Sequence, residues 1–198
     1  MQNQHMVPLE LAKRYFVRDW RNGLAILSAV RPGEWADILA VLGEFQLLKS
    51  DVLKPGGGKS DISKKIDGHF TRLGWKEKQF DTRIIVDDSE FISPTHKVDC
   101  YKNRVALEVE WNNKDPFYDR DLNNFRLLFE LRAIDVGVIL TRSTELRDVF
   151  NDIGKNMDMS TTHLDKLIPR LEGGGGGGCP VVVIAITKET YVDDGKDQ

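Results

Sequence analysis

The sequence predicts an α/β protein in which helices cover a central mixed β-sheet. Segments with helical periodicity alternate with short apolar runs, and two of these runs, at 136–141 and 179–186, have the composition of buried strands. A third observation is a hairpin pattern at 98–110, which adds an antiparallel pair to the predicted sheet. The 198 residues, 40% of them hydrophobic, are enough for one domain with a substantial core.

The N-terminal third is predicted to be mainly helical. Residues 8–29 show helical periodicity, which Gly23 weakens, so they form either one helix or two elements. Pro32 is suited to open a helix that runs to about Leu47, and its broad apolar surface indicates either deep burial or self-association. Residues 54–59 are a glycine-rich loop. Ser60 and Asp61 then begin a basic helix that ends at Gly74 and would line one side of a cleft.

The rest of the chain alternates strands and helices. The expected elements are a strand at 78–87, the hairpin, a helix at 121–132, a strand at 136–141, a helix at 145–150, a polar loop at 154–162, a helix at 162–171, and a final strand at 179–186. Residues beyond Thr190 are polar and are expected to fray. This order implies a mixed sheet with helices on its faces.

Six consecutive glycines, 173–178, precede the final strand. Composition alone leaves two alternatives, a flexible linker between domains or a loop within one domain. The apolar strand that resumes at once favours a surface loop anchored at both ends.

Composition excludes several classes of protein. A net charge of −3 argues against non-specific coating of nucleic acid, although a local basic cleft is compatible with it. Cys100 and Cys179 are too few for a disulfide scaffold and lack the spacing of zinc ligands, so both are expected to be reduced thiols. No apolar run has the length of a membrane span and no signal-peptide core is visible, which predicts a cytoplasmic protein with no membrane partner.

The hairpin carries acidic residues where apolar packing is expected. Glu108 and Glu110 share one face of the strand that begins at Val105, because successive side chains point to opposite faces. The turn at 101–104 would bring Asp99 next to Glu108. Three converging carboxylates repel one another and lose hydration, a cost that a bound divalent cation such as Mg²⁺ removes. The alternative is that these acids are simply solvated on an edge hairpin.

Asp99, followed after eight residues by Glu108-Val109-Glu110, resembles the PD-(D/E)xK nuclease signature, with Glu110 where the usual lysine would stand. The segment 99–140 resembles the BglII and BstYI family of type II restriction endonucleases, and the likeness extends over about 60–187. The motifs that carry it are Gly74-Trp75-Lys76-Glu77, Arg104 to Glu110, Tyr118-Asp119, Ile134 to Val138 and Val181 to Ile186.

The resemblance implies a restriction-endonuclease-like core and one endonuclease domain over 1–198. Within it, residues 1–58 would be N-terminal helices and a candidate dimerisation region, 60–187 the catalytic and DNA-recognition core, and 188–198 a tail. The implied activity is that of a homodimer that uses Mg²⁺, for which Mn²⁺ may substitute, to cut both strands of a short palindromic duplex site. It would leave 5′-phosphates, with a GATC-like centre in the site and a companion DNA methyltransferase as partner.

The resemblance also implies roles for individual residues. Asp99 and Glu108 would hold the metal, with the main-chain carbonyl of Val109 as a further ligand, and the ion would polarise the scissile phosphate and activate water. Glu110 either binds metal or accepts the proton of the attacking water. Ser63 aligns with a metal-site asparagine of the family, but Ser63 and Lys64 are also ordinary helix-face residues, and Lys64 could contact phosphate.

Two polar segments are predicted to contact double-stranded DNA. Asparagine can pair bidentately with adenine and lysine can reach guanine or phosphate, although both segments are also typical turns or helix caps. The candidate DNA-binding residues are Asn112, Asn113 and Lys114 after the hairpin, and Lys155, Asn156, Ser160, Thr161, Thr162 and His163 before the helix at 162–171. In that helix, Lys166 and Arg170 would add positive charge.

Two other functions remain open from the sequence. A repair or recombination nuclease could use the same core and recognise DNA structure instead of sequence. A non-catalytic DNA-binding module could keep the fold, but it would be expected to have lost a metal carboxylate, and Asp99 and Glu108 are both present.

Overall fold

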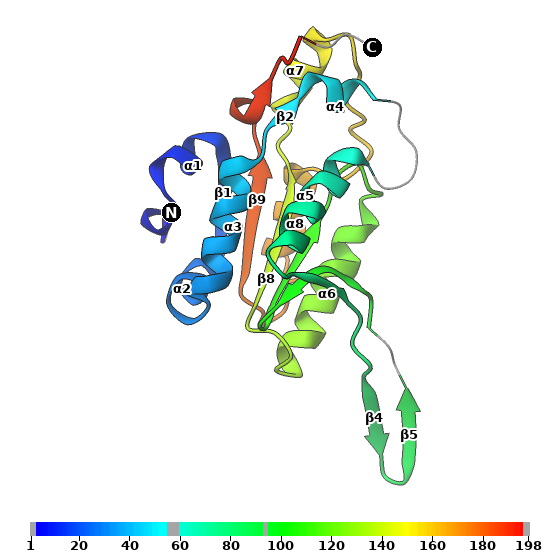
Figure 1. Cartoon of the computed structure of the whole chain (residues 1–198). Helices are drawn as coiled ribbons and strands as arrows, with labels where there is room; N and C mark the ends of the chain where they lie inside the picture. Colours follow the sequence, from blue (N-terminus) through cyan, green and yellow to red (C-terminus); the bar gives the residue numbers. More distant parts are fainter. Residues whose placement is uncertain (1–2, 55–59, 93–94, 196–198) are drawn as a thin grey trace.

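The computed structural model describes residues 3–54, 60–92 and 95–195, and it confirms the predicted α/β fold. A six-stranded mixed sheet forms its centre (Figure 1). In spatial order the strands are β1 (Tyr15–Trp20), β9 (Val181–Ile186), β8 (Val136–Arg142), β7 (Val105–Val109), β6 (Val98–Lys102) and β3 (Lys76–Lys78). Strands β9, β8 and β7 are parallel, and the remaining neighbours are antiparallel.

Helices cover both faces of this sheet and create two separate apolar cores. One core lies between the sheet and the N-terminal helices, and the other lies between the sheet and α6 and α8. On the first face are α1 (Leu9–Arg14), α2 (Gly23–Val30), α3 (Pro32–Glu44), α4 (Lys49–Leu53), α5 (Asp61–Arg72) and α7 (Leu146–Asp152); on the second are α6 (Pro116–Glu130) and α8 (Leu164–Glu172). The broad apolar surface predicted for the helix from Pro32 is explained by burial, since Trp35, Ile38, Val41 and Leu42 are enclosed.

Residues 15–20 differ from the prediction, which treated 8–29 as helical. They form β1, an edge strand antiparallel to β9, flanked by α1 and α2. Tyr15 and Val17 are buried in the alternating pattern of a strand. The spacing of apolar residues across the short helices on both sides matched a helical period, which concealed this six-residue strand. The N-terminal segment therefore contributes directly to the central sheet.

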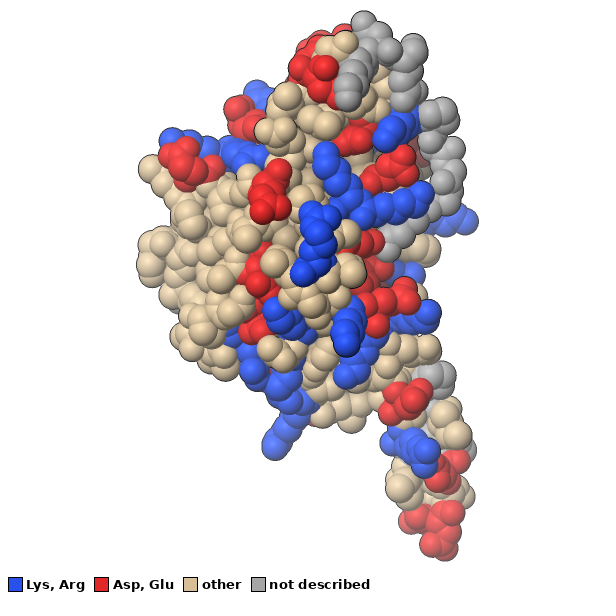
Figure 2. All heavy atoms as spheres, in the orientation of Figure 1, with Lys and Arg blue, Asp and Glu red and all other residues tan. Residues whose placement is uncertain are grey.

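The single strand predicted at 78–87 is also wrong. The chain forms β3 at 76–78, and then β4 (Arg83–Val86) and β5 (Ser89–Ile92), which pair only with each other in the described residues. This second hairpin projects from the body of the molecule (Figure 1). Figure 2 shows acidic side chains at its far end, where Asp87, Asp88 and Glu90 are exposed.

The segment after Thr190 is ordered further than expected. Tyr191–Val192 forms β10, which pairs in parallel with β2 (Leu47–Leu48). Two short 3-10 helices, Gln4–Met6 and Lys188–Thr190, complete the elements. The predicted loop at 54–59 lies outside the described residues apart from Lys54.

The glycine run forms turns that pack against α6. A Cβ added to Gly177, whose φ is +56°, would lie 2.6 Å from the Arg126 side chain, and one on Gly175 would lie 3.1 Å from Leu122. Glycine is therefore required for this close approach, and the run leads directly into β9. Among the described residues, no helix has the length and apolar character needed to cross a bilayer.

Candidate active site

The hairpin of β6 and β7 brings Asp99 and Glu108 together. The register Cys100↔Leu107 places these acids opposite each other. The backbone amide of Asp99 donates to Oε2 of Glu108 at 3.2 Å, and the amide of Val109 donates to Oδ2 of Asp99 at 3.1 Å. The predicted adjacency of Asp99 and Glu108 is therefore confirmed. Both carboxylates lie toward the face of the sheet that α6 and α8 cover, because Glu108 shares its strand face with Ala106.

Glu110 lies at the point where β7 ends and the polar loop begins. Its backbone amide donates to the carbonyl of Leu140 on β8, and its side chain accepts a bond from Nδ2 of Asn113 at 2.9 Å. Only 1% of the residue is exposed. Burial, and then the charge of Asp121, raises the pKa of Glu110 to about 9. Without a bound cation, Glu110 is therefore protonated near neutral pH.

Asp121 is a fourth acid of this cluster that the sequence analysis did not identify. It lies on the buried face of α6 with Tyr118, Leu122 and Phe125. Burial raises the pKa of Asp121 and Asp99 adds to this shift, while Arg120 and Glu110 oppose it. An acidic residue among the apolar positions of an amphipathic helix was the available signal in the sequence.

The geometry of the acids fits a hard cation. Oε1 of Glu108 and Oδ2 of Asp121 are buried and have no hydrogen-bond partner in the part of the chain that the structure describes. Burial, Asp121 and Asp99 together raise the pKa of Glu108 well above its ordinary value. This excess of buried carboxylate oxygen is what a divalent cation would relieve. Among the described residues, no group of three His, Cys, Asp or Glu side chains is arranged to hold a metal. The predicted ligand set, two carboxylates and a main-chain carbonyl, is smaller than such a group.

Ser63 and Lys64 lie in the first turn of α5 and have structural partners there. The Ser60 side chain caps the helix by accepting the amide of Ser63 at 3.0 Å, and the two hydroxyls lie 2.9 Å apart. Lys64 pairs with Asp61 in the same turn. Ser63 is thus engaged in the helix cap.

The two predicted DNA-contact loops are joined to each other. Lys114 and Thr161 form an isolated antiparallel bridge. The amide of Thr162 donates to the carbonyl of Asn113 at 2.8 Å, and the amide of Asn113 donates to Oγ1 of Thr162 at 3.1 Å. These bonds bring residues from distant parts of the chain into one surface at the end of β7.

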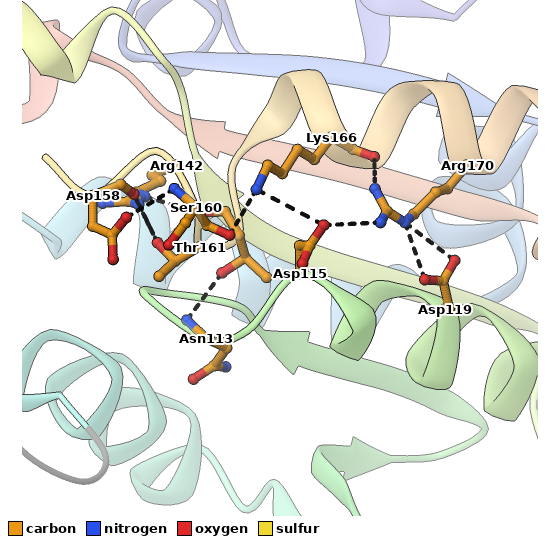
Figure 3. Close-up of polar contacts among 10 residues, drawn as sticks. Asn113, Asp115, Asp119, Arg142, Asp158, Ser160, Thr161, Lys166 and Arg170 are labelled. Atoms are coloured by element: carbon orange, nitrogen blue, oxygen red, sulfur yellow. Dashed lines mark hydrogen bonds and ion pairs between the residues drawn. The ribbon is translucent and has the colours of Figure 1, made fainter.

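Arg142, the last residue of β8, holds the loop at 158–162 in place through hydrogen bonds. Its guanidinium is fully buried and donates to the carbonyls of Thr162 and Asp158 and to Oγ1 of Thr161, at 3.0, 2.7 and 2.6 Å (Figure 3). It lies 5.8 Å from the centre of the Trp111 ring. Within the described residues Nη1 has no hydrogen-bond partner, and burial lowers the pKa of Arg142 to about 10.

The joined loops differ in which side chains they expose. Thr162 and His163 are buried, and His163 is the N-cap residue of α8. Neither Thr161 nor Thr162 therefore caps this helix, although small hydroxyl residues at a helix start are typical caps. Burial removes Thr162 and His163 from the surface that DNA could reach. The exposed residues are Asn112, Lys114, Asn156 and Ser160, and the half-buried ones are Asn113, Lys155 and Thr161.

The cations of α8 are neutralised by acids of α6 and its N-cap. Arg170 contacts Asp115 and Asp119, each at 3.1 Å, and Lys166 lies 3.8 Å from Asp115 (Figure 3). These pairs fasten α8 to the start of α6, so the two basic residues add little net positive charge to the surface.

A mixed sheet in which one hairpin pairs the half-buried Asp99 with the buried Glu108 is typical of a restriction-endonuclease-like α/β protein. The family model described as restriction endonuclease BglII/BglIII matches residues 15–186, and the chain belongs to this family. The match includes β1, which lies before the segment on which the resemblance was first based. No curated protein sequence matches the chain. Membership of this family implies an enzyme that cleaves DNA at specific sites.

Proposed function

We propose that the chain is a type II restriction endonuclease that uses Mg²⁺ to hydrolyse both strands of a short palindromic duplex site and leaves 5′-phosphates. One observation carries the proposal: the paired acids Asp99 and Glu108 lie on the same hairpin that leads, through Glu110, into the loop of Asn112, Asn113 and Lys114. Cleavage chemistry and base recognition would thus be separated by only a few residues of one continuous segment.

The roles proposed for the acids follow from their environments. Asp99, Glu108 and the carbonyl of Val109 would hold the ion, which polarises the scissile phosphate when bound. Glu110 is positioned by Asn113 and would accept the proton of the attacking water once a cation favours its ionised form. The hydrogen bond from Asn113 connects this acid to the loop that would contact DNA.

Base recognition is assigned to the exposed residues of the joined loops. Asn112 and Asn156 offer both donors and acceptors, Ser160 offers a hydroxyl, and Lys114 can reach guanine or a phosphate. A palindromic site is read by a protein with matching two-fold symmetry, so we propose a homodimer as the active species. A companion methyltransferase and a GATC-like centre of the site are further parts of the proposal.

The test is incubation of the purified full chain with unmethylated plasmid and Mg²⁺, beside a sample with chelator. Discrete fragments that can be religated directly are expected, because ligation requires 5′-phosphates. Asp99→Ala and Glu108→Ala should abolish cutting, whereas Glu10→Ala, an exposed acid of α1, should cut as the parent does. Smeared or structure-dependent products would contradict site specificity, and no Mg²⁺-dependent cutting of diverse DNA would refute the proposal. Light scattering of the same sample checks the dimer.

A further inference from the structure

The proposed metal site does not explain why Arg120 lies at the edge of the acid cluster formed by Asp99, Glu108, Glu110 and Asp121. Arg120 donates from Nε and Nη2 to Oδ1 of Asp121, at 2.9 and 2.8 Å, and its Nη2 lies 3.6 Å from Oε1 of Glu110. Glu110 and Asp121 are almost completely buried, but 32% of the Arg120 side chain is exposed. Arg120 therefore connects the buried acids with solvent.

The guanidinium is held in place on two sides. Its Cζ lies 4.1 Å from the centre of the Phe117 ring, one turn earlier in α6, and Asp121 fixes the opposite edge. Within the described residues, the hydrogen bonds of Arg120 use Nε and Nη2, which leaves Nη1 donors for a further partner. A planar cation with a fixed orientation and free donors is suited to a phosphate group.

A positive charge beside the acid cluster would favour the approach of a phosphodiester. When a cation holds the acids in their ionised form, a phosphodiester that approaches Asp99, Glu108, Glu110 and Asp121 would meet negative charge, to which Glu110 contributes where the nuclease signature has a lysine. A bound divalent ion would offset only part of this charge. Arg120 interacts electrostatically with Glu110, Asp121 and His96, so its charge acts on groups beyond the acid that it bonds.

We propose that Arg120 contacts the scissile phosphate and stabilises the negative charge that develops on it during hydrolysis, with Asp121 as the residue that positions the guanidinium. The inference rests on the proposed nuclease function and adds a catalytic cation from α6 to the acids of the hairpin. Removal of one such donor typically lowers the rate of the chemical step about 10²- to 10³-fold.

The test compares Arg120→Gln and Arg120→Lys with Arg126→Gln, a matched change in the same helix at an exposed arginine that bonds Asn123. Under single turnover with saturating enzyme and Mg²⁺, Arg120→Gln should cleave at least about 100-fold more slowly, Arg120→Lys should keep part of the rate, and Arg126→Gln should match the parent. Guanidinium ion added at millimolar concentration should partly restore cleavage by Arg120→Ala, because the space between Asp121 and Phe117 would accept it.

A second measurement does not depend on cleavage. Without metal, the affinity for duplex DNA measured against salt concentration should have a slope smaller by about one for Arg120→Gln than for the parent and Arg126→Gln, as expected when one phosphate contact is lost. A parental rate, or a slow rate with an unchanged slope and no guanidinium rescue, would overturn the inference. If the parent itself does not cleave, the proposed function fails, and the salt slope still decides whether Arg120 contacts the DNA backbone.

Discussion

The backbone amide of Asp99 donates a hydrogen bond to the carboxylate of Glu108, and the carboxylate of Asp99 in turn accepts the amide of Val109. Each acid is thus oriented by the opposite strand of the hairpin, so strand pairing sets their relative positions. A preformed arrangement of this kind avoids the entropy cost of ordering the acids when a cation binds. The proximity of the acids lowers the stability of the metal-free protein through electrostatic repulsion, and unfolding experiments can measure this effect.

Conversion of Glu108 to glutamine should separate stability from activity. Glu108→Gln keeps the shape and removes a carboxyl group whose ionisation burial and neighbouring acids oppose, so the metal-free protein at pH 8 should melt at a higher temperature than the parent. Cleavage should fall by at least about 10³-fold, because the metal loses a ligand. Calorimetry and a plasmid assay check both effects. Glu10→Gln, at an exposed site, should change neither, and a lower melting temperature for Glu108→Gln would argue against repulsion in the cluster.

The stability of the metal-free protein should decrease with pH above neutrality. The pKa of Glu110 is about 9 in the native state and near 4.5 in the unfolded chain, so between these values the native state binds the extra proton. The stabilisation is complete below pH 4.5 and is lost as the pH rises through 9. The free energy of unfolding should therefore fall by about 1.4 kcal/mol per pH unit for each such proton.

Urea unfolding at pH 7, 8 and 9 with a chelator measures this slope. Glu110→Gln should reduce the slope without removing it, because the pKa of Glu108 is also raised. Addition of Mg²⁺ should flatten the dependence further, since the ion favours the ionised acids. Stability that rises over this pH range would contradict the raised pKa values.

Loss of the Arg142 guanidinium should loosen the joined loops. Arg142→Met keeps the apolar stem but removes the bonds to Asp158, Thr161 and Thr162, so the free energy of unfolding should fall by about 2 to 4 kcal/mol. Backbone amides of 158–162 should exchange faster with solvent than those of β8. Arg147→Met, at an exposed site on α7, provides the control. Unchanged exchange in 158–162 would show that the loop keeps its conformation without Arg142.

Two glycine-to-alanine substitutions should change the free energy of unfolding in opposite directions. A Cβ on Gly137 of β8 would lie 2.3 Å from the Phe125 ring of α6, so Gly137→Ala should destabilise the fold by about 1 to 3 kcal/mol through overpacking. Gly43 lies in helix α3 with nothing within 4 Å of such a Cβ, and Gly43→Ala should stabilise by about 0.5 to 1 kcal/mol. Urea unfolding of both variants is the measurement. A neutral Gly137→Ala would mean that α6 can move away from the sheet.

The parts of the site that sequence could predict are those set by local geometry. Alternation along 105–110 and the length of the turn were enough to pair Asp99 with Glu108. Asp121 was not predictable in this way, because its approach to Glu110 depends on how α6 packs on the sheet. The burial of Thr162 likewise depends on a bridge between loops that are distant in sequence. Strand β1 was missed since its edge position is defined only by pairing with β9.

The bridge between Lys114 and Thr161, with Arg142 bonded to the second of the two loops, limits how the proposed DNA specificity could be altered. Loops that exchange backbone hydrogen bonds cannot be replaced independently, because a new length or conformation in one removes partners from the other. Grafting residues 112–114 alone from another endonuclease should mainly yield poorly folded loops, whereas exchange of both loops as one unit keeps the contacts between them. Change of specificity in this scaffold would therefore proceed by paired substitutions.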